Sequence, residues 1–473
     1  MRAHVDPRRS VFARVRDFVD FFAVSSPARF AIIIFSALVL LLTAILALPI
    51  ASADGSVTPL ADAFFTAVSA ICVTGLSTVN MATHWSLFGD VAILVGLQIG
   101  GIGVMTLASM LGLIVSRRLG LRAKLMAASD TNLSRIHHGP VAEGQAVRLG
   151  EIGGLLATVA ISTLVIEAAL TLLITPRLLL AGMDPWTATW HGFYFAASAF
   201  TNTGFSPNAE GIAPFASDPW FLTVLGLGVI LGSLGFPVIF ALVRALRGGR
   251  LSVHVKLTLV TTGLLFVLGA LAILVFEWGN AATIGAQDPA TRPLTALFMS
   301  AMTRSGGFAT IDVSEMTGAS LLVVDMLMFV GGGSASTAGG IKVTTLAVIF
   351  LAAMAEARGH QDVQVFRRRI PSDVLRLAVA VVMWGATIVA AATIAMLVIT
   401  DEPLDRVLFD VISAFATCGL STGVTEAAPD AGKYVLAATM WAGRVGTVTL
   451  AAALAATQRR QLFSFAEERP IVG

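Results

Sequence analysis

The same short phrase occurs four times along the chain, each time between two long apolar runs. It begins with Ser-Ala and ends six or seven residues later in a glycine, which a bulky apolar residue follows. The copies, each a little over a hundred residues from the next, are Ser69–Leu76, Ser198–Phe205, Ser300–Phe308 and Ser413–Leu420. Four matching loops in one chain can close a ring around a single axis, and this constrains the fold more than any other feature.

The apolar runs indicate a membrane protein. The chain is 56% hydrophobic and 13% charged, which excludes an ordinary soluble domain. Its apolar blocks reach the length of about 20 residues that a helix needs to cross the hydrocarbon core. Eight such blocks, in four pairs around the phrases, predict a polytopic protein. They are Phe30–Leu48, Val91–Val115, Leu155–Leu173, Phe221–Leu242, Leu257–Phe276, Leu321–Ala352 (interrupted), Ala378–Ile399 and Val435–Ala456.

Lys and Arg are concentrated between the pairs of blocks and near both ends of the sequence. Of 31 such residues, 24 lie in the segments 2–29, 117–148, 244–256, 358–376 and 459–469. The loops inside the pairs are mildly acidic instead. By the positive-inside rule, we expect both termini and the connections between pairs to be cytoplasmic. The phrases then enter the membrane from outside.

A short apolar segment precedes each phrase. At about ten residues these segments cannot cross the membrane, so they predict re-entrant pore helices. They are Ala61–Ala70, Trp190–Phe200, Thr295–Thr303 and Val407–Ala416. We therefore expect an all-α fold of four repeats of helix, re-entrant pore loop and helix around one pseudo-fourfold pore. The expected divisions are an N-terminal segment 1–27, repeats 28–116, 149–246, 254–356 and 373–457, a linker 117–148 and a tail 458–473.

The glycine phrases have the composition of an ion-selective constriction. A permeating cation must exchange its water for protein oxygens, and backbone carbonyls supply these without fixed charge. Turning successive carbonyls inward requires unusual φ angles that glycine adopts freely. Glycines can instead permit close helix packing, but four copies in register favour a filter. The predicted ion-binding residues are Val73, Thr74, Gly75, Asn202, Thr203, Gly204, Ser305, Gly306, Gly307, Thr417, Cys418 and Gly419.

The third phrase has two possible registers. Counting from Ser-Ala aligns Gly306 with the other glycines, whereas matching Gly-Phe to Gly204-Phe205 aligns Gly307. We prefer Gly307.

The sixth apolar block is interrupted by glycines. Five of the ten residues from Gly331 to Gly340 are glycine, each of which weakens a helix by about 1 kcal/mol relative to alanine. Loop 331–340 could be a packing kink, but a flexible loop below the filter could also occlude the pathway and swing aside. In that case, shortening it should raise ion flux.

Several of these motifs resemble the Trk/Ktr/HKT superfamily of potassium transporters, and most of all its KtrB-type membrane subunits. The matching stretches are the four phrases, Gln98–Gly103, Gly339–Lys342, Gly443–Gly446 and the ending Glu467–Gly473. The resemblance implies potassium uptake across a bacterial plasma membrane, with Na⁺ as a second candidate ion. The family's third phrase usually reads Arg-Thr-Ala-Gly-Phe, so Ser305-Gly306 is a departure, and it supports Gly307 as the filter glycine.

The resemblance also implies a gate and partners. The gate would comprise Gly331, Gly332, Gly333, Ser334, Gly339, Gly340, Lys342 and Arg444. The chain would form a homodimer in membrane lipid, seated on a cytosolic ring of Rossmann-type, KtrA-like subunits that bind ATP or ADP. No cofactor in this chain and no nucleic acid are expected. Segments 117–148 and 358–369 are candidate docking surfaces, and a Trk-type complex with a different regulatory partner is the alternative.

Three cations lie at predicted membrane depth, where charge is costly and usually faces water or protein. Arg444 is either a gate residue or the partner of a buried acid such as Asp325 or Glu167, and both roles can hold together. We expect Arg304 to brace the third pore loop through backbone carbonyls or an acid.

Other functional classes fit less well. Secondary transporters of organic solutes often have two inverted repeats rather than four loops in one orientation. No His-Glu-x-x-His motif is present, and we do not expect an enzyme. Cys72 and Cys418, the two cysteines, both lie in phrases, and we expect buried thiols rather than a disulfide.

Overall fold

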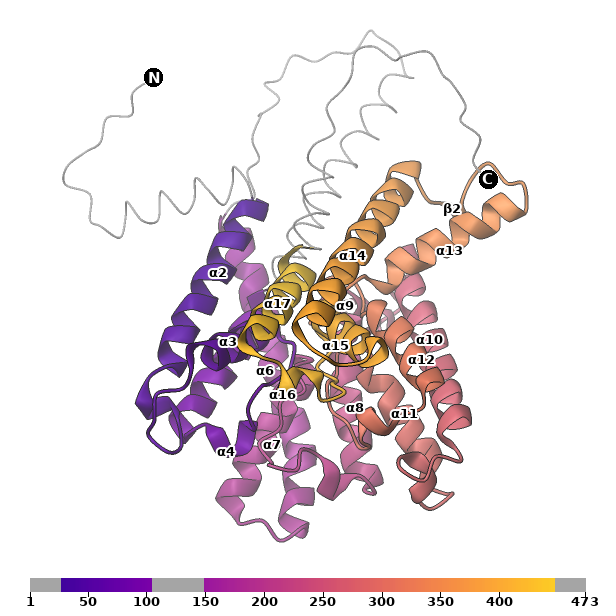
Figure 1. Ribbon diagram of the computed structural model, residues 1–473. Coiled ribbons are helices and arrows are strands. Elements are labelled where there is room, and N and C mark those ends of the chain that lie inside the picture. Colours follow the sequence, from indigo (N-terminus) through magenta and orange to yellow (C-terminus); the bar gives the residue numbers. More distant parts are fainter. Residues whose placement is uncertain (1–26, 104–148, 447–473) are drawn as a thin grey trace, which may run out of the picture.

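The computed structural model describes residues 27–103 and 149–446 and is predominantly helical. The described helices form four successive groups along the chain, called units below, which are coloured from indigo to yellow in Figure 1. The first contains α2 (Pro27–Leu46), α3 (Leu60–Cys72), α4 (Met81–His84) and a helix over Leu87–Gly103. The second contains α6 (Leu149–Leu180), α7 (Pro185–Phe200), α8 (Pro219–Leu234) and α9 (Phe236–Ala245).

In the first and second units a long helix is followed by a half-length helix, a loop and one or more further helices. The third and fourth units have the same order. The third contains α10 (Val253–Glu277), α11 (Arg292–Met302), α12 (Gly318–Phe329) and α13 (Val343–Ala357). The fourth contains α14 (Ser372–Ile399), α15 (Leu404–Ala416), α16 (Val424–Ala427) and α17 (Asp430–Trp441), which a π-helical turn over Ala442–Gly446 continues. A hairpin of β1 (Gln364–Val365) and β2 (Arg368–Arg369) joins these units.

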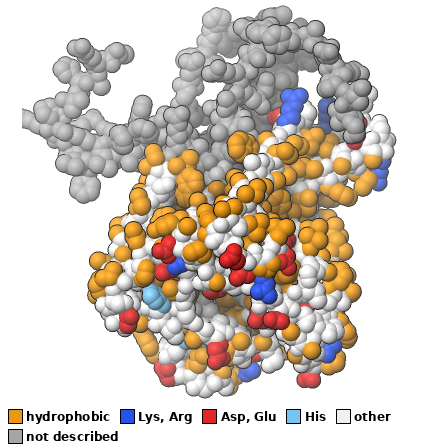
Figure 2. All heavy atoms as spheres, viewed as in Figure 1, with side chains coloured by type: hydrophobic (Ala, Val, Ile, Leu, Met, Phe, Trp, Pro, Cys, Tyr) orange, Lys and Arg blue, Asp and Glu red, His pale blue; other side chains and the backbone are white. Residues whose placement is uncertain are grey.

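Three described helices are long and apolar enough to cross a membrane, namely Ala157–Leu180, Val253–Glu277 and Ser372–Ile399. A fourth crossing arises if α8 and α9 are taken together. The expected parts 104–115 and 447–456 of two further spans lie outside the described residues, as do the segments 1–26, 117–148 and 458–473. Hydrophobic side chains cover the flanks and upper part of the described structure, whereas Asp and Glu side chains gather lower and centrally (Figure 2). These apolar surfaces are those of an integral membrane protein.

The expected span Phe221–Leu242 is not one helix. It breaks at Gly235, where α8 and α9 meet at a bend of 101°. Gly235 has φ +88°, which is unfavourable for other residues, and Pro237 lies in the first turn of the next helix. The sequence Gly-Phe-Pro therefore ends α8 within the apolar block.

The half-length helices lie inside the bundle. Helix α3 packs against α2 and α17, α7 against α6 and α8, α11 against α10 and α8, and α15 against α12, α14 and α17. Almost every residue of α15 from Phe409 onward is buried, and the same holds for α3 from Phe65. Each half-length helix therefore ends in the protein interior, where the glycine phrase begins.

Candidate functional site

Each glycine phrase has two residues with left-handed backbone, and one residue separates them. The second of the two is the glycine, which accepts this conformation without a Cβ penalty. The first positions are Val73, Asn202, Ser305 and Thr417, with φ of 57°, 61°, 66° and 48°. The glycines are Gly75, Gly204, Gly307 and Gly419, with φ of 90°, 85°, 71° and 94°.

The four glycines meet around one axis. A Cβ atom placed on any of them would strike the backbone of another loop, well inside the normal contact distance. The nearest atoms to that Cβ are Thr203 O at 1.7 Å for Gly75, Gly307 Cα at 2.6 Å for Gly204, Gly204 Cα at 2.9 Å for Gly307 and Thr74 O at 2.5 Å for Gly419. Cys418 O lies 3.0 Å from the position of a Gly307 Cβ. Each loop thus adjoins the next in chain order, and the fourth adjoins the first.

The third loop reaches the ring by a longer route. Gly307, rather than Gly306, has the positive φ and the contacts to neighbouring loops. Helices α3 and α15 end three residues before their glycine, α7 four residues before it, and α11 five. The additional residues are Thr303 and Arg304, which lie between the end of α11 at Met302 and the first left-handed residue, Ser305. Just after them, Gly306 N donates to Met302 O at 2.7 Å.

The serine that begins the phrase has a local structural role in the first and fourth copies. Ser69 Oγ accepts a hydrogen bond from Gly75 N at 3.0 Å, and Ser413 Oγ accepts one from Gly419 N at 3.1 Å. Ser300 Oγ instead donates to Phe266 O at 2.8 Å. The sequence alone did not reveal this role of the Ser in Ser-Ala, because it depends on how the chain turns back toward the helix end.

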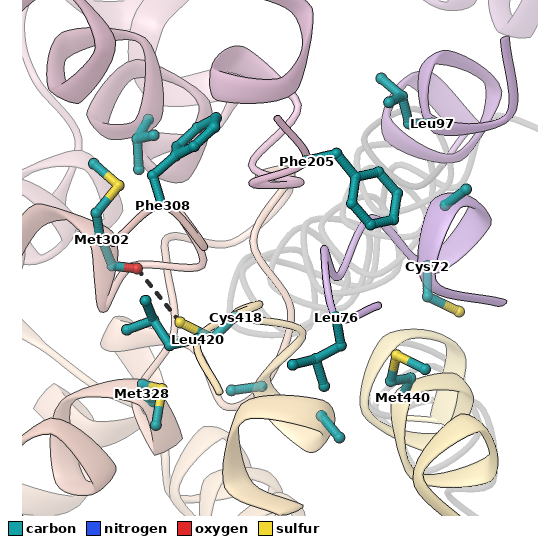
Figure 3. Packing of buried hydrophobic residues seen from close by; sticks show 14 of the residues in the cluster. Cys72, Leu76, Leu97, Phe205, Met302, Phe308, Met328, Cys418, Leu420 and Met440 are labelled. Atoms are coloured by element: carbon teal, nitrogen blue, oxygen red, sulfur yellow. Dashed lines mark hydrogen bonds between the residues drawn. The ribbon is translucent and has the colours of Figure 1, made fainter. Parts of the chain in front are cut away.

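The apolar residues after the glycines pack around the loops. Figure 3 shows them in chain order around the middle of the view, and each is at most 2% exposed. They are Leu76, Phe205, Phe308 and Leu420. Cys418 Sγ lies among them and donates to Met302 O at 3.4 Å, and Cys418 and Cys72 are both buried, free thiols.

Side chains at the first left-handed position tie some loops together. Asn202 Nδ2 donates to Arg304 O at 2.9 Å, and Ser305 Oγ donates to Ala416 O at 3.1 Å. In both cases the acceptor directly precedes the corresponding residue of the next loop. The equivalent Thr417 Oγ1 has no hydrogen-bond partner in the described structure, and Val73 has no polar side chain. The second, third and fourth loops are therefore joined by side chains at this position.

Loop 331–340 lies directly against two of the glycine phrases. Thr337 Oγ1 donates to Asn202 Oδ1 at 2.6 Å. A Cβ on Gly339 would lie 2.2 Å from Thr417 Oγ1. On its other side the loop is held at the α8–α9 break, where Gly333 N donates to Ser233 O at 2.7 Å. The loop thus fills the space between the second and fourth phrases and the broken helix.

The three interior cations all bind carbonyls of this loop or its flanks. Arg444 Nη1 donates to Thr337 O, and Lys342 Nζ donates to Ala338 O at 2.6 Å. Arg304 Nη1 donates to Val330 O at 2.6 Å, just past the end of α12, so it binds backbone carbonyls. Within the described residues, no ion pair joins Arg444 to Asp325 or Glu167, the two acids considered from the sequence.

Comparison with known proteins assigns the chain to a family. A family model described as TrkH, cation transport protein, matches residues 17–462. The chain belongs to this TrkH family. It is 34% identical to the Ktr system potassium uptake protein B of Vibrio alginolyticus, over 91% of each chain. It is 32% identical to the Ktr system potassium uptake protein D of Bacillus subtilis, over 95% of this chain and 97% of the relative. The resemblance found in the sequence is confirmed.

A solved TrkH-family structure has the same fold. The potassium transporter TrkH from Vibrio parahaemolyticus is 19% identical and matches with a TM-score of 0.63, covering 95% of this chain and 86% of that chain. This likeness concerns the fold alone. It agrees with the helical, polytopic architecture expected from the sequence.

One buried residue beside the fourth glycine phrase was missed from the sequence. Asp410, on α15, is fully buried, and its carboxylate accepts bonds from the backbone N–H groups of Thr422 and Thr425, each at 2.8 Å. The hydroxyls of Ser421, Thr422 and Thr425 donate to it as well. Asp410 therefore anchors the segment that leaves the fourth phrase. A lone carboxylate within the short apolar segment Val407–Ala416 was the available signal.

Proposed function

We propose that this chain takes up K⁺ through a pore along the axis where the four glycine phrases meet. The observation that carries the proposal is the ring of backbone contacts, in which the carbonyls of Thr74, Thr203 and Cys418 lie beside the glycines of neighbouring loops. Carbonyl oxygens replace the water of a dehydrated cation without binding it too tightly to leave. The names of relatives as potassium uptake proteins support K⁺ as the ion.

The half-length helices α3, α7, α11 and α15 act in this proposal as re-entrant pore helices entered from outside. Their C-terminal ends, which carry partial negative charge, lead into the phrases and favour a cation there. Both termini then lie in the cytoplasm of a bacterial cell. The excess of Lys and Arg between the units supports this orientation.

Loop 331–340 is the gate in this proposal. It lies against the second and fourth phrases, and Arg444 and Lys342 bind its carbonyls. Guanidinium and ammonium groups at this place repel a cation as long as the loop holds them there. Displacement of the loop would move the charges and open the pathway together.

A homodimer and a cytosolic nucleotide-binding ring complete the proposal. The word "system" in the relatives' names supports a separate partner. The basic segment 358–369 offers it a defined shape, because Phe366 and Arg367 form the two-residue turn of the β1–β2 hairpin, both with positive φ. Arg369 pairs with Asp362 at 2.9 Å and holds the hairpin to the preceding loop. ATP or ADP would bind to the ring.

Uptake of rubidium into proteoliposomes containing the purified chain tests the proposal. We expect uptake that excess K⁺ suppresses and that Na⁺ suppresses less. Adding the ring partner should change the rate in a way that differs between ATP and ADP. Uptake that an organic solute drives, or no cation uptake in the presence of partner and ATP, contradicts the proposal. Growth of a potassium-uptake-deficient strain at low K⁺ provides the cellular counterpart.

A further inference from the structure

A buried acid and an amide join the first and second units. Glu167 lies on α6, and Gln98 lies on the helix Leu87–Gly103. Gln98 Nε2 and Glu167 Oε2 are 2.6 Å apart. Glu167 is 0% exposed. The other oxygen of each group, Oε1 in both residues, has no hydrogen-bond partner in the described structure.

An ionised Glu167 is poorly matched to this environment. A carboxylate without a counter-ion is strongly disfavoured at full burial. The buried cations of the described structure, Arg304 and Arg444, bind backbone carbonyls elsewhere, and so does Lys342. With Glu167 ionised, Oε1 of Glu167 and Oε1 of Gln98 both face no donor among the described residues, which is costly in itself. Among the described residues, the pair therefore lacks one positive charge or one donor hydrogen.

We infer that Glu167 carries a proton, so that Gln98 and Glu167 form a buried proton-binding site. A carboxylic acid is neutral and supplies the missing donor hydrogen. The distance of 2.6 Å is short for an N–H···O bond and typical of an O–H···O bond. Because the oxygen and nitrogen of an amide can exchange places in an assignment, the short contact fits an acid O–H donating to the Gln98 amide oxygen. In the other orientation, where Gln98 Nε2 donates to Glu167 Oε2, the proton serves to remove the buried charge.

The helix that carries Gln98 contacts the chain next to the first two glycine phrases. Two residues after Gln98, a Cβ on Gly100 would lie 2.1 Å from Ile71 O, near the end of α3. A Cβ on Gly101 would lie 3.2 Å from Thr201 Cγ2, at the end of α7. The helix that carries Gln98 is thus pressed onto the backbone leading into both phrases. These phrases have no polar tie through Val73, so the protonated pair supplies a buried connection between their units.

Infrared difference spectroscopy of the full chain in lipid membranes tests this inference independently of any transport activity. We expect the wild type to show a carboxylic acid C=O band that shifts in D₂O and is missing in Glu167→Gln. The exposed acid Asp312, which holds the local turn at Ser314, provides the control, since Asp312→Asn should remove only carboxylate absorption. The double variant Gln98→Glu/Glu167→Gln exchanges the two groups and should restore an acid band.

Two outcomes would overturn the inference. One is that Glu167→Gln removes carboxylate absorption instead of an acid band. The other is that the acid band appears in choline buffer but disappears in Na⁺ buffer, because then a metal cation occupies the site. Rubidium uptake gives a second readout, and Glu167→Gln should retain it within about twofold, since a neutral amide replaces a neutral acid. Glu167→Leu, which leaves Gln98 unpaired, should lower uptake and thermal stability, and equal loss in both variants contradicts a neutral Glu167.

Discussion

Arg444 Nη1 donates to the backbone carbonyl of Thr337, whose hydroxyl in turn donates to Asn202 Oδ1 in the second glycine phrase. Three segments far apart in the sequence are thereby connected through one residue of loop 331–340. The π-helical turn that carries Arg444 is itself pressed onto α15, because a Cβ on Gly443 would lie 1.8 Å from Phe415 O. A displacement of the loop must therefore break bonds both to the π-helical turn and to the second glycine phrase.

Replacing Arg444 should open the pathway. Arg444→Gln removes a charged donor and the positive charge, and hydrogen bonds to charged groups contribute about 1.5–3 kcal/mol. We expect rubidium flux in proteoliposomes to rise about tenfold or more. Arg444→Lys retains the positive charge, so it separates the effect of charge repulsion on the ion from that of the hydrogen bond to Thr337 O. Arg358→Gln, at an exposed arginine, is the control. Flux equal to that of the wild type in Arg444→Gln would mean that Arg444 does not restrain the gate.

Thr337→Val should weaken the hold of the loop on the second phrase. The valine is similar in size but leaves Asn202 Oδ1 without its donor, at a cost of about 1–3 kcal/mol. We expect higher flux together with reduced discrimination between K⁺ and Na⁺, measured by competition. Thr387→Val is the control, because the Thr387 hydroxyl is exposed and bonds within its own helix, to Met383 O. A variant with normal flux and normal discrimination contradicts the proposed contact.

Removing Gly332 and Gly333 from loop 331–340 should raise rubidium flux above that of the wild type. These residues anchor the loop at the α8–α9 break, through the bond from Gly333 N to Ser233 O. The same proteoliposome assay measures the effect. Unchanged flux from a folded variant argues against a gating loop.

Gly75→Ala should abolish selective uptake. The added Cβ would lie 1.7 Å from Thr203 O, which the ring cannot accommodate without moving a neighbouring loop. We expect rubidium uptake to fall by about a hundredfold. Gly55→Ala is a matched control, because Gly55 has φ +73° but no described atom lies within 4 Å of its Cβ position. It carries only the backbone strain of about 1–2 kcal/mol, so similar losses in the two variants would refute a steric cause.

Asp410→Asn should destabilise the protein. The amide cannot accept all the bonds that the carboxylate accepts from Ser421, Thr422 and Thr425, and it introduces an unpaired donor. We expect a loss of about 3 kcal/mol and a lower unfolding temperature in detergent. Asp312→Asn, on the surface, should leave that temperature nearly unchanged. An unaltered unfolding temperature in Asp410→Asn would show that the segment after the fourth phrase is held by other contacts.

The sequence predicted the helical, polytopic architecture, because apolar length is a local property of the chain. It preferred Gly307 by matching Gly-Phe to Gly204-Phe205, and the φ angles align the same residue. It did not predict the break at Gly235, since the apolar pattern continues across it. The role of Asp410, the Ser69 bond to Gly75 N and the carbonyl partner of Arg444 depend on contacts between residues distant in sequence or on turn geometry. No periodicity encodes these.

The glycine lies three, four, five and three residues after the end of the preceding helix in the first, second, third and fourth loops. This inequality has a consequence for how the ring changes during evolution. In an assembly of four identical chains, any substitution enters every position of the ring at once. Here a substitution enters one position and leaves three intact. The third loop has an additional residue and still brings Gly307 into contact with Gly204. In the proposed pore, ion preference can therefore change through one loop at a time, while the other three loops keep their residues.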